Sequence, residues 1–419
     1  MRILIATDAF PPNCGGSGWS TYELARGLQA RGHGLVIVQP RPGAAASGTR
    51  EYDGFAIRQF ASAAPNVPFV RNYFKNERLY ARLRPWLSDI VRRERIDIVH
   101  AQHVLTTPPA IEAARLGGVP VVCTVRDYWP VCYWSDLVHD YASDDLCPGC
   151  SRSMMRRCIR PRAGCAWPLA VPLVPYMSAN LARKRQALAR ADAVVAVSSA
   201  IARDLGERAP ELAATRVECI PNPVDIAGLR RIADSRPAPL EAPYALFVGK
   251  LAPNKGVTRL FPAIARARLG WPLVIVGDGP DRREVERLAA ASGRDVRLTG
   301  WLPREDALAW LRHASLLVFP SHGPESLSRV LLEAAALGVP IAAMNTGGTG
   351  DIVQHEVTGL LSRTAEALGD DVSRLVVDGA LRERLSSAAR SNVERTFDSA
   401  AVVGRIETLY QQLIEARSA

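Results

Sequence analysis

The 419-residue sequence lacks any apolar run that could cross a bilayer, which takes about 20 consecutive apolar residues. We expect no signal peptide, because the first apolar run is too short for a signal core and soon reaches Asp8. No G-x-G-x-x-G spacing follows that run, which counts against a nicotinamide-dependent enzyme. With 48% hydrophobic and 22% charged residues, the chain resembles ordinary globular proteins, and we expect it in the cytoplasm.

Lysine is scarce, since nearly all of the 52 basic residues are arginine, and the net charge of +10 is unevenly distributed. Residues 1–215 hold 27 basic against 18 acidic residues, whereas residues 216–419 hold 25 against 24. No basic helix with interleaved aromatic residues occurs, so no nucleic-acid partner is expected. The basic half predicts contact with an anionic partner. This partner is either the inner face of a membrane, where the protein would bind peripherally, or a lipid-phosphate acceptor. An arginine-rich proteome would explain the same excess.

The length of the chain exceeds the usual size of one hydrophobic core, so we expect two domains. In both halves, continuous Val, Ile and Leu runs alternate with helical patterns, which predicts α/β domains with parallel sheets buried on both faces. A Pro-rich segment at 235–243 separates the halves. Ligands of such sheets bind at the carboxyl ends of the strands, which places a site between the domains.

The segment 320–334 carries the most information about function. An apolar strand stops at a Pro-Ser turn, Glu325 follows, and Glu333 lies eight residues later on a helical pattern. Eight residues are slightly more than two helical turns, so both carboxylates can face one cleft. The amides of Leu327 and Ser328 are expected to open the helix and bind an anion. If these two glutamates were the only signal, a helix with one solvent-exposed glutamate and one capping glutamate would be the better interpretation.

Two glycine-containing loops provide further candidates for binding phosphate. Gly249, Lys250 and Lys255 follow an apolar strand, where glycine permits close approach and two ammonium groups can neutralise a diphosphate. Gly16 and Gly18 lie between the first strand and an amphipathic helix expected from residue 20, which predicts a second phosphate cradle. The amides and lysines suit phosphate and the carboxylates suit hydroxyls, so the three segments predict a site for a phosphorylated sugar.

In this order, the segments resemble the retaining glycosyltransferases of family 4, which have the two-domain GT-B fold. The resemblance covers nearly the whole chain and extends to Ile220–Asp225, Val276–Pro280 and Gly347–Leu361. It implies two Rossmann-like domains whose parallel sheets face an interdomain cleft. The implied divisions are an acceptor-binding domain at 1–235, a nucleotide-sugar-binding domain at 240–396, and a helix at 397–419 that returns to the first domain.

The resemblance also implies a reaction, in which a sugar passes from a nucleotide-sugar donor to an envelope glycan or a lipid-linked acceptor. Retaining enzymes of this family need no cofactor for catalysis. The acceptor attacks the donor sugar on the same face from which the leaving group departs. The protein then stabilises the charge developing on the diphosphate. This role falls to Lys250, Lys255 and the amides near Gly16 and Leu327–Ser328. Glu325 would hold the hydroxyls of the donor sugar and Glu333 those of the ribose.

Arg126 stands where the family usually has an active-site histidine. Arginine cannot act as a base, but it can bind a sugar hydroxyl or the diphosphate, so Arg126 joins Lys255 and Glu325 as a catalytic candidate. Asp127 is the expected acceptor contact and a fourth catalytic candidate, with His103 beside it. Two alternatives stay open: a catalytically silent GT-B protein that binds a nucleotide sugar, and a GT-B sugar epimerase. The paired lysines and the two glutamates disfavour the epimerase.

Five of the eight cysteines fall within 34 residues, in an insertion at about 130–178. This spacing, which contains a Cys-x-x-Cys knuckle, suits a structural zinc site that holds a loop without a core of its own. Free thiols explain the cluster as well, and disulfides are disfavoured in the cytoplasm. The candidate ligands are Cys132, Cys147, Cys150, Cys158 and Cys165.

The same insertion continues with five arginines between residues 152 and 162 and an apolar, aromatic stretch at 167–176. Basic residues next to apolar and aromatic side chains are typical of segments that lie on a membrane surface. A partly buried insertion loop would show the same pattern, so both interpretations stay open.

Overall fold

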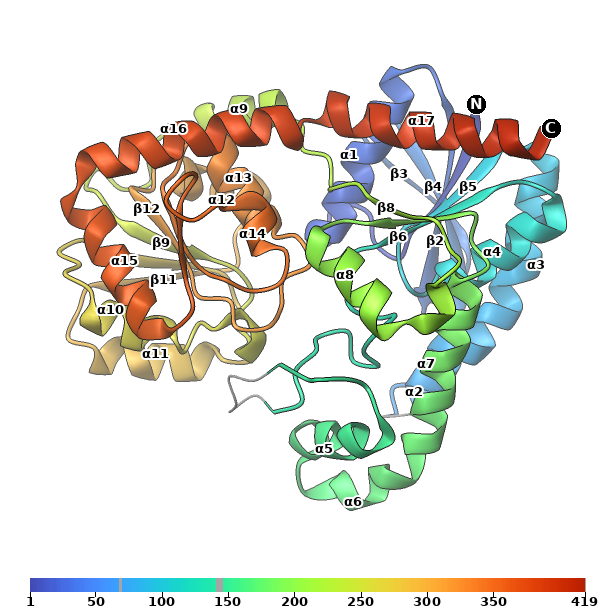
Figure 1. Ribbon diagram of the computed structural model, residues 1–419, viewed down its shortest axis with the longest axis horizontal. Coiled ribbons are helices and arrows are strands. Elements are labelled where there is room, and N and C mark those ends of the chain that lie inside the picture. The colour runs from blue at the N-terminus through green and yellow to red at the C-terminus, as the bar shows by residue number, and fades with distance from the viewer. Residues whose placement is uncertain (68–69, 141–145, 419) are drawn as a thin grey trace.

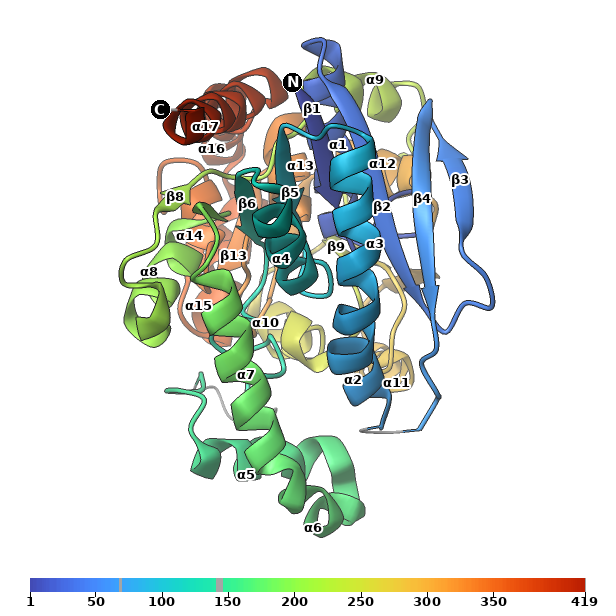
Figure 2. The same cartoon turned by 90° about the vertical axis from the view of Figure 1, so that its right-hand side faces the viewer.

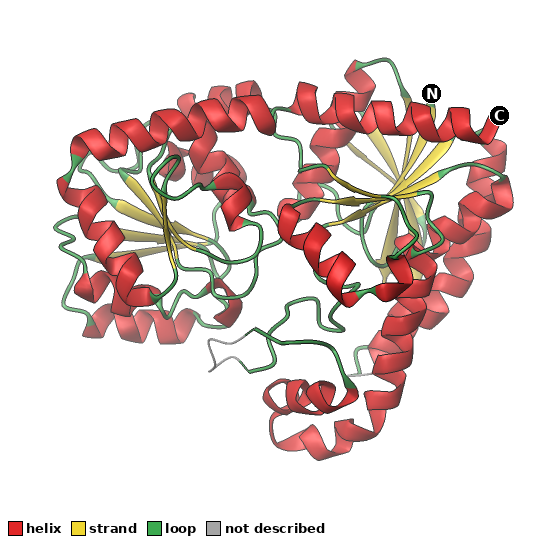
Figure 3. Cartoon of the chain, in the orientation of Figure 1, coloured by secondary structure: helices red, strands yellow, loops and turns green. Residues whose placement is uncertain are grey.

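The computed structural model describes residues 1–67, 70–140 and 146–418 and shows two α/β domains side by side (Figure 1). In each domain the strands form a central sheet with helices around it (Figure 3). Residues 141–145 of the predicted insertion lie outside the described residues. The described part of the chain contains no helix with both the length and the apolar character needed to cross a membrane.

The first domain has a sheet with the strand order β3-β4-β2-β1-β5-β6-β7-β8. Its strands are β1 (Arg2–Ala6), β2 (Gly34–Pro42), β3 (Gly48–Tyr52), β4 (Phe55–Ser62), β5 (Ile98–Ala101), β6 (Val121–Val125), β7 (Ala193–Ala196) and β8 (Val217–Cys219). Its helices are α1 (Gly16–Ala30), α2 (Val70–Tyr73), α3 (Leu79–Arg93), α4 (Thr107–Gly117), α5 (Arg152–Ala163), α6 (Trp167–Ala170), α7 (Val174–Leu188) and α8 (Ser199–Arg208).

Both faces of this sheet are buried, as the continuous apolar strands predict. Side chains alternate along a strand, so Ile3 and Ile5 of β1 belong to one hydrophobic cluster, with Leu24 and Leu28 of α1. Leu4 points to the other face, where it belongs to the cluster that contains residues of α3 and α4. The sheet is therefore a rigid platform whose loops at the strand ends carry the site.

Strand β3 is antiparallel to β4 and departs from the predicted parallel arrangement. Tyr52 pairs with Phe55, so Asp53 and Gly54 alone form the turn. Their φ angles are +46° and +77°, and Asp-Gly is a favoured pair in two-residue hairpins that need positive φ at both positions. The sequence predicts no strand here, because the side chains of this edge strand are exposed or half-buried and form no apolar run.

The second domain has a parallel sheet with the strand order β11-β10-β9-β12-β13-β14. Its strands are β9 (Ala245–Val248), β10 (Leu273–Val276), β11 (Val296–Gly300), β12 (Leu316–Phe319), β13 (Ile341–Met344) and β14 (Leu360–Ser362). The helices from here to the C-terminus are α9 (Ile226–Asp234), α10 (Leu260–Arg266), α11 (Arg282–Ala291), α12 (Arg304–Arg312), α13 (Arg329–Leu337), α14 (Thr349–Ile352), α15 (Ala365–Val377), α16 (Gly379–Thr396) and α17 (Ser399–Ser418).

Helix α17 lies across the first domain although it follows the second in sequence (Figures 1 and 2). Val403 and Tyr410 belong to the hydrophobic cluster on the α1 face of the first sheet. His33 Nε2 lies 2.8 Å from Oε1 of Glu407, and the Tyr410 hydroxyl is hydrogen-bonded to Nδ1 of the buried His100. The chain thus crosses between the domains twice, which limits how they can move apart.

Helices α5, α6 and α7 form an arm that projects from the first domain (Figures 1 and 3). The expectation that this insertion lacks a core was wrong, because Met155 and Ile159 of α5 pack with Met177 and Leu181 of α7. These residues recur one turn apart on short helices, so they form no apolar run in the sequence. Near α6, Leu169 is 84% exposed, and the arginines at 156, 157 and 160 are exposed as well.

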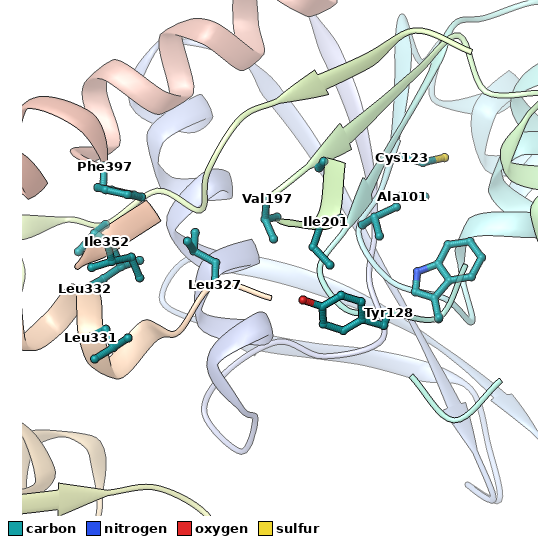
Figure 4. Close-up of a cluster of buried hydrophobic side chains, with 14 of the residues drawn as sticks. Ala101, Cys123, Tyr128, Val197, Ile201, Leu327, Leu331, Leu332, Ile352 and Phe397 are labelled. Atoms are coloured by element: carbon teal, nitrogen blue, oxygen red, sulfur yellow. The ribbon is translucent and has the colours of Figure 1, made fainter. Parts of the chain in front are cut away.

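One hydrophobic cluster contains side chains from both domains (Figure 4). Leu327 of the second domain and Val197 and Tyr128 of the first belong to it. The Tyr128 hydroxyl donates to the backbone oxygen of Glu325 at 3.2 Å. Gly347 has a φ of +53°, and a Cβ there would clash with that same oxygen, so only glycine fits. These contacts hold the segment around Glu325 against the end of β6.

Candidate active site

Two cavities lie where the domains meet. The smaller, of about 270 Å³, lies at the carboxyl ends of β6, β9 and β12. The larger, of about 530 Å³, is lined by Trp19, Tyr22, Arg304 and Asp398 among others, and by none of the predicted site residues. We place the candidate site in the smaller cavity because the predicted residues gather there. Those that line it are Gly16, Arg126, Gly249, Lys255, Glu325, Leu327 and Ser328.

Two helices, one from each domain, begin at the smaller cavity. Helix α1 begins at Gly16 after the N-cap Gly15, and α13 begins at Arg329 after the N-cap Ser328. Gly15 has no side chain that could cap α1, and the Ser328 side chain makes no capping hydrogen bond to α13. The first amides of a helix have no partners within it and carry partial positive charge. With both helix starts lining the cavity, the arrangement suits an anion such as a diphosphate.

The start of the first helix was predicted too late in the chain. Gly16 and Gly18, expected in a loop, both lie within α1. Glycine has a low helix propensity, which is why the amphipathic pattern alone placed the start near residue 20. Gly18 packs against Cys14, where a Cβ would clash with the thiol, and it does not line the cavity. Only Gly16 of the pair reaches the candidate site.

Lys255 is the lysine of the second domain that lines the cavity. Its Nζ lies 2.7 Å from Oε1 of Glu325, which also accepts a hydrogen bond from the Ser321 hydroxyl. Gly256 follows with a φ of +64°, and a Cβ there would clash with a backbone oxygen at the end of β12. Lys250 is exposed and does not line the cavity. The structure therefore brings one of the two predicted lysines to the site.

Glu333 lies behind the cavity wall and is held by arginines. Its Oε1 accepts from Nε of Arg329 at 2.9 Å and lies 3.1 Å from Nη2 of Arg304. Both contacts are made by Oε1, and no hydrogen bond reaches Oε2 of Glu333 among the described residues. The carboxylate does not itself line the cavity, whereas Glu325 does.

Arg329 links the domains, because its Nη2 also donates to Oε1 of Glu23 on α1. Both side chains are less than a tenth exposed, and the Arg304 guanidinium stacks over the Trp19 ring at 4.4 Å. We call Glu23, Arg304, Arg329 and Glu333 the interdomain ion cluster; it separates the two cavities. Glu23 and Arg304 were not predicted, because no local sequence pattern marks them. Arg329 could have been found, since it lies four residues before Glu333 on one helix.

Arg126 follows β6 and is buried on the first-domain side of the cavity. Its Nη1 donates to Oδ1 of Asn222 and its Nη2 to Oε1 of Gln102. Burial, together with the nearby charge of Arg329, lowers the pKa of Arg126 to about 9, so it remains a cation at neutral pH. Gln102 was missed, although it follows the end of β5 as Arg126 follows the end of β6.

A second polar group lies at the carboxyl ends of β1, β5 and β6 and comprises Asp8, His103 and Asp127. Nδ1 of His103 lies 3.0 Å from the Thr7 hydroxyl oxygen and 3.3 Å from the Asp8 amide nitrogen. Burial lowers the pKa of His103 to about 3 and raises those of Asp127 to about 6 and Asp8 to about 7. Nε2 of His103 and Oδ1 of Asp8 are buried and have no hydrogen-bond partner among the described residues.

A sugar hydroxyl can both donate and accept a hydrogen bond, so it could pair with such unpartnered polar atoms. The sequence analysis named His103 and Asp127 but not Asp8, which follows the first strand in the same way. Asp127 itself accepts a hydrogen bond from the Trp129 amide at 2.8 Å. Neither His103 nor Asp127 lines the smaller cavity, although Arg126, the neighbour of Asp127, does.

The five clustered cysteines differ in position. Cys165 is exposed, whereas Cys132, Cys147 and Cys158 are buried and Cys150 is half-buried. The Cys132 thiol contacts that of Cys150, and the Cys147 thiol contacts that of Cys158. Within the described ranges, no three His, Cys, Asp or Glu side chains are arranged to hold a metal ion. Structural zinc therefore stays a prediction, with the four contacting thiols as its candidate ligands.

If these thiols bind zinc, elemental analysis of the purified protein should find about one zinc ion per chain. Cys150→Ser should then lower the zinc content, while Cys165→Ser, the exposed control, should not. Chelation should loosen the arm yet spare nucleotide binding, because most of the predicted donor residues lie in the second domain. A zinc content near zero in protein prepared without chelator would identify the residues as ordinary thiols.

Two Rossmann-like domains with parallel sheets that meet at a cleft are typical of the GT-B class of glycosyltransferases. Family comparisons agree: residues 14–227 match Glycosyltransferase Family 4 and residues 230–392 match Glycosyl transferases group 1. The protein belongs to glycosyltransferase family 4. The predicted family and GT-B fold are thereby confirmed, and the chain is a glycosyltransferase that uses a nucleotide sugar.

Similar proteins span nearly the whole chain. A GDP-mannose-dependent alpha-mannosyltransferase of Mycolicibacterium smegmatis is 30% identical over 94% of this chain and 92% of its own length. A glycogen synthase of Mycobacterium tuberculosis is 27% identical, over 98% and 94% respectively. Sucrose-phosphate synthase from Thermosynechococcus elongatus has a TM-score of 0.72 at 20% identity and covers 99% of this chain and 100% of its own. At that identity the structural match shows the fold alone.

Proposed function

We propose that the protein transfers a sugar, with retention of anomeric configuration, from its nucleotide-sugar donor to an envelope glycan or a lipid-linked acceptor. The observation that carries the proposal is the cavity between the domains, where two helix N-termini, Lys255 and Glu325 converge. This combination supplies positive charge for a leaving diphosphate and a carboxylate for sugar hydroxyls.

In this proposal the diphosphate lies against the first amides of α1 and α13 and near Lys255. As the bond from the sugar to the diphosphate breaks, negative charge grows on the phosphate oxygens, and these groups stabilise it. Glu325 orients the donor sugar by accepting from its hydroxyls, and Glu333 accepts from the ribose through Oε2. The support for these roles is the clustering of Lys255 and Glu325 and the unused oxygen of Glu333.

The acceptor is proposed to bind the first domain at Asp8, His103 and Asp127. The unpartnered Nε2 of His103 and Oδ1 of Asp8 support this role, because buried polar atoms normally have partners. For a lipid-linked acceptor, the arm would lie at an anionic membrane surface, which the exposed Leu169 and its neighbouring arginines favour.

A panel of nucleotide sugars in thermal-shift and coupled nucleotide-release assays tests the proposal. We expect one donor to raise the melting temperature and to release its nucleotide when the acceptor is added. Binding without turnover for every donor would instead favour the catalytically silent protein. Failure of every nucleotide sugar to bind would contradict the assigned site.

Glu333→Ala is expected to weaken nucleotide binding by about 1–3 kcal/mol, the range for lost hydrogen bonds to a charged group. Calorimetry with nucleoside diphosphates measures the change. Glu394→Ala is the matched control, because Glu394 is another carboxylate of the second domain paired with an arginine, Arg230, at 2.6 Å. An unchanged affinity in a folded Glu333→Ala protein would remove Glu333 from the site.

A further inference from the structure

Three cations line the smaller cavity, and two of them are neutralised by carboxylates of the protein. Lys255 faces Glu325 at 2.7 Å. Arg329 contacts both Glu23 and Glu333. For these two side chains the positive charge is already balanced, so a ligand anion at either one competes with or adds to an existing ion pair.

Arg126, the third cation, has no carboxylate partner among the described residues. Its Nη atoms donate to the neutral amide oxygens of Asn222 and Gln102, and its Nε is buried and has no hydrogen-bond partner there. The residue is only 7% exposed. A buried guanidinium without a counter-charge is unfavourable, so its place in the cavity wall indicates that a substrate provides the anion.

Arg126 lines the same cavity as Glu325, the proposed contact of the donor sugar. Tyr128, two residues further along, donates to the backbone oxygen of Glu325 at 3.2 Å, so this end of the first sheet lies next to Glu325. Of the elements assigned to the diphosphate, Lys255 and the start of α13 belong to the other domain, whereas the start of α1 belongs to the same domain as Arg126. The Nε–H has no hydrogen-bond partner among the described residues, and a guanidinium edge can bind the two oxygens of a carboxylate, as it can those of a phosphate.

We infer that Arg126 binds a carboxylate on the donor sugar, so that the donor is a nucleotide-activated uronic acid. The inference rests on the proposed function, because it takes Glu325 as a contact of the donor sugar. A diphosphate could occupy the same guanidinium edge, and the experiment below separates these two sources of negative charge.

Calorimetry with matched donors tests the inference: UDP-glucuronate against UDP-glucose, GDP-mannuronate against GDP-mannose, and UDP and GDP alone. We expect the wild type to bind the uronate of one pair about tenfold or more tightly than the neutral sugar, the size of one charge-assisted hydrogen bond. Arg126→Gln should abolish this preference, and Arg126→Lys should keep part of it. Arg115→Gln, which changes an exposed arginine on α4, should leave the preference intact.

A wild type that binds UDP or GDP but prefers neither uronate overturns the inference and leaves the proposed function standing. If Arg126→Gln weakens binding of the free nucleotide as much as that of the uronate sugar, the arginine is a diphosphate ligand and the inference is again wrong. If no nucleotide binds at all, the proposed function fails with it. The preference of the wild type for a uronate donor is measured without any variant. The inference can therefore be overturned even if Arg126→Gln does not fold.

Discussion

Lys255→Ala is expected to lower kcat by about 10²-fold or more, because it removes the lysine that lines the cavity where the diphosphate is proposed to leave. The group sits in a partly water-excluded site, where a charge stabilises a developing anion more than it would in water. Nucleotide affinity should fall less than kcat, since the charge on the phosphate oxygens grows as the bond breaks. Steady-state kinetics with the identified donor, together with calorimetry, measures both effects.

Three comparisons sharpen this test. Lys255→Arg keeps a cation near Glu325 and should recover part of the rate. Lys250→Ala removes the other lysine of the loop, which lies exposed outside the cavity. It should lower kcat less than Lys255→Ala does. Thermal unfolding of each variant shows whether Glu325, left without its ion pair, destabilises the fold. Near-normal turnover in a folded Lys255→Ala protein would exclude the lysine from the mechanism.

Arg329→Ala is expected to reduce the free energy of unfolding by about 3–5 kcal/mol, the usual range for breaking a buried ion pair from one side. The change leaves the carboxylates of Glu23 and Glu333 buried without the arginine that bridges them. Because Glu23 belongs to α1 and Arg329 to α13, the loss also removes a contact between the domains. Urea denaturation, read as a shift of the midpoint at an unchanged slope, measures the effect.

The control is Arg266→Ala, which breaks a bidentate pair with Asp370 on the protein surface. Both side chains of that pair are more than half exposed, so water and salt already screen it and little stability should be lost. A double-mutant cycle of Arg329→Ala with Glu23→Gln would show whether the two residues are coupled. A midpoint for Arg329→Ala that matches the Arg266 control would show that the interdomain ion cluster does not stabilise the protein.

The parts of the fold that the sequence predicted correctly are those that local periodicity encodes. Continuous Val, Ile and Leu runs identified the parallel strands of both sheets except β14, because a strand buried on two faces needs apolar side chains at every position. Strand β3 was missed for the same reason, since an edge strand with exposed side chains has no such run. The Asp53-Gly54 turn was the available signal, and it depends on backbone conformation rather than on hydrophobicity.

Within the site, prediction succeeded where a residue's role depends on its place at a strand end or helix start. Lys255, Glu325 and the start of α13 follow this rule and line the cavity. Asp8 and Gln102 also follow strand ends and could have been named. Lys250 satisfied the rule but points into solvent, because side chains near a strand end face different directions and sequence position does not reveal which.

By itself, the sequence determined the order of strands and helices, the division into two domains and the candidates for phosphate binding, since each depends on residues close together in the chain. Only the tertiary structure decided that Glu23 and Arg304 would surround Glu333, and that Arg126 would be buried without a carboxylate partner. The contact of Arg126 with Asn222 joins residues about 100 positions apart, and that of Arg329 with Glu23 joins residues about 300 apart. Packing of the two domains brings such residues together, and no local pattern encodes which charges will be left unbalanced.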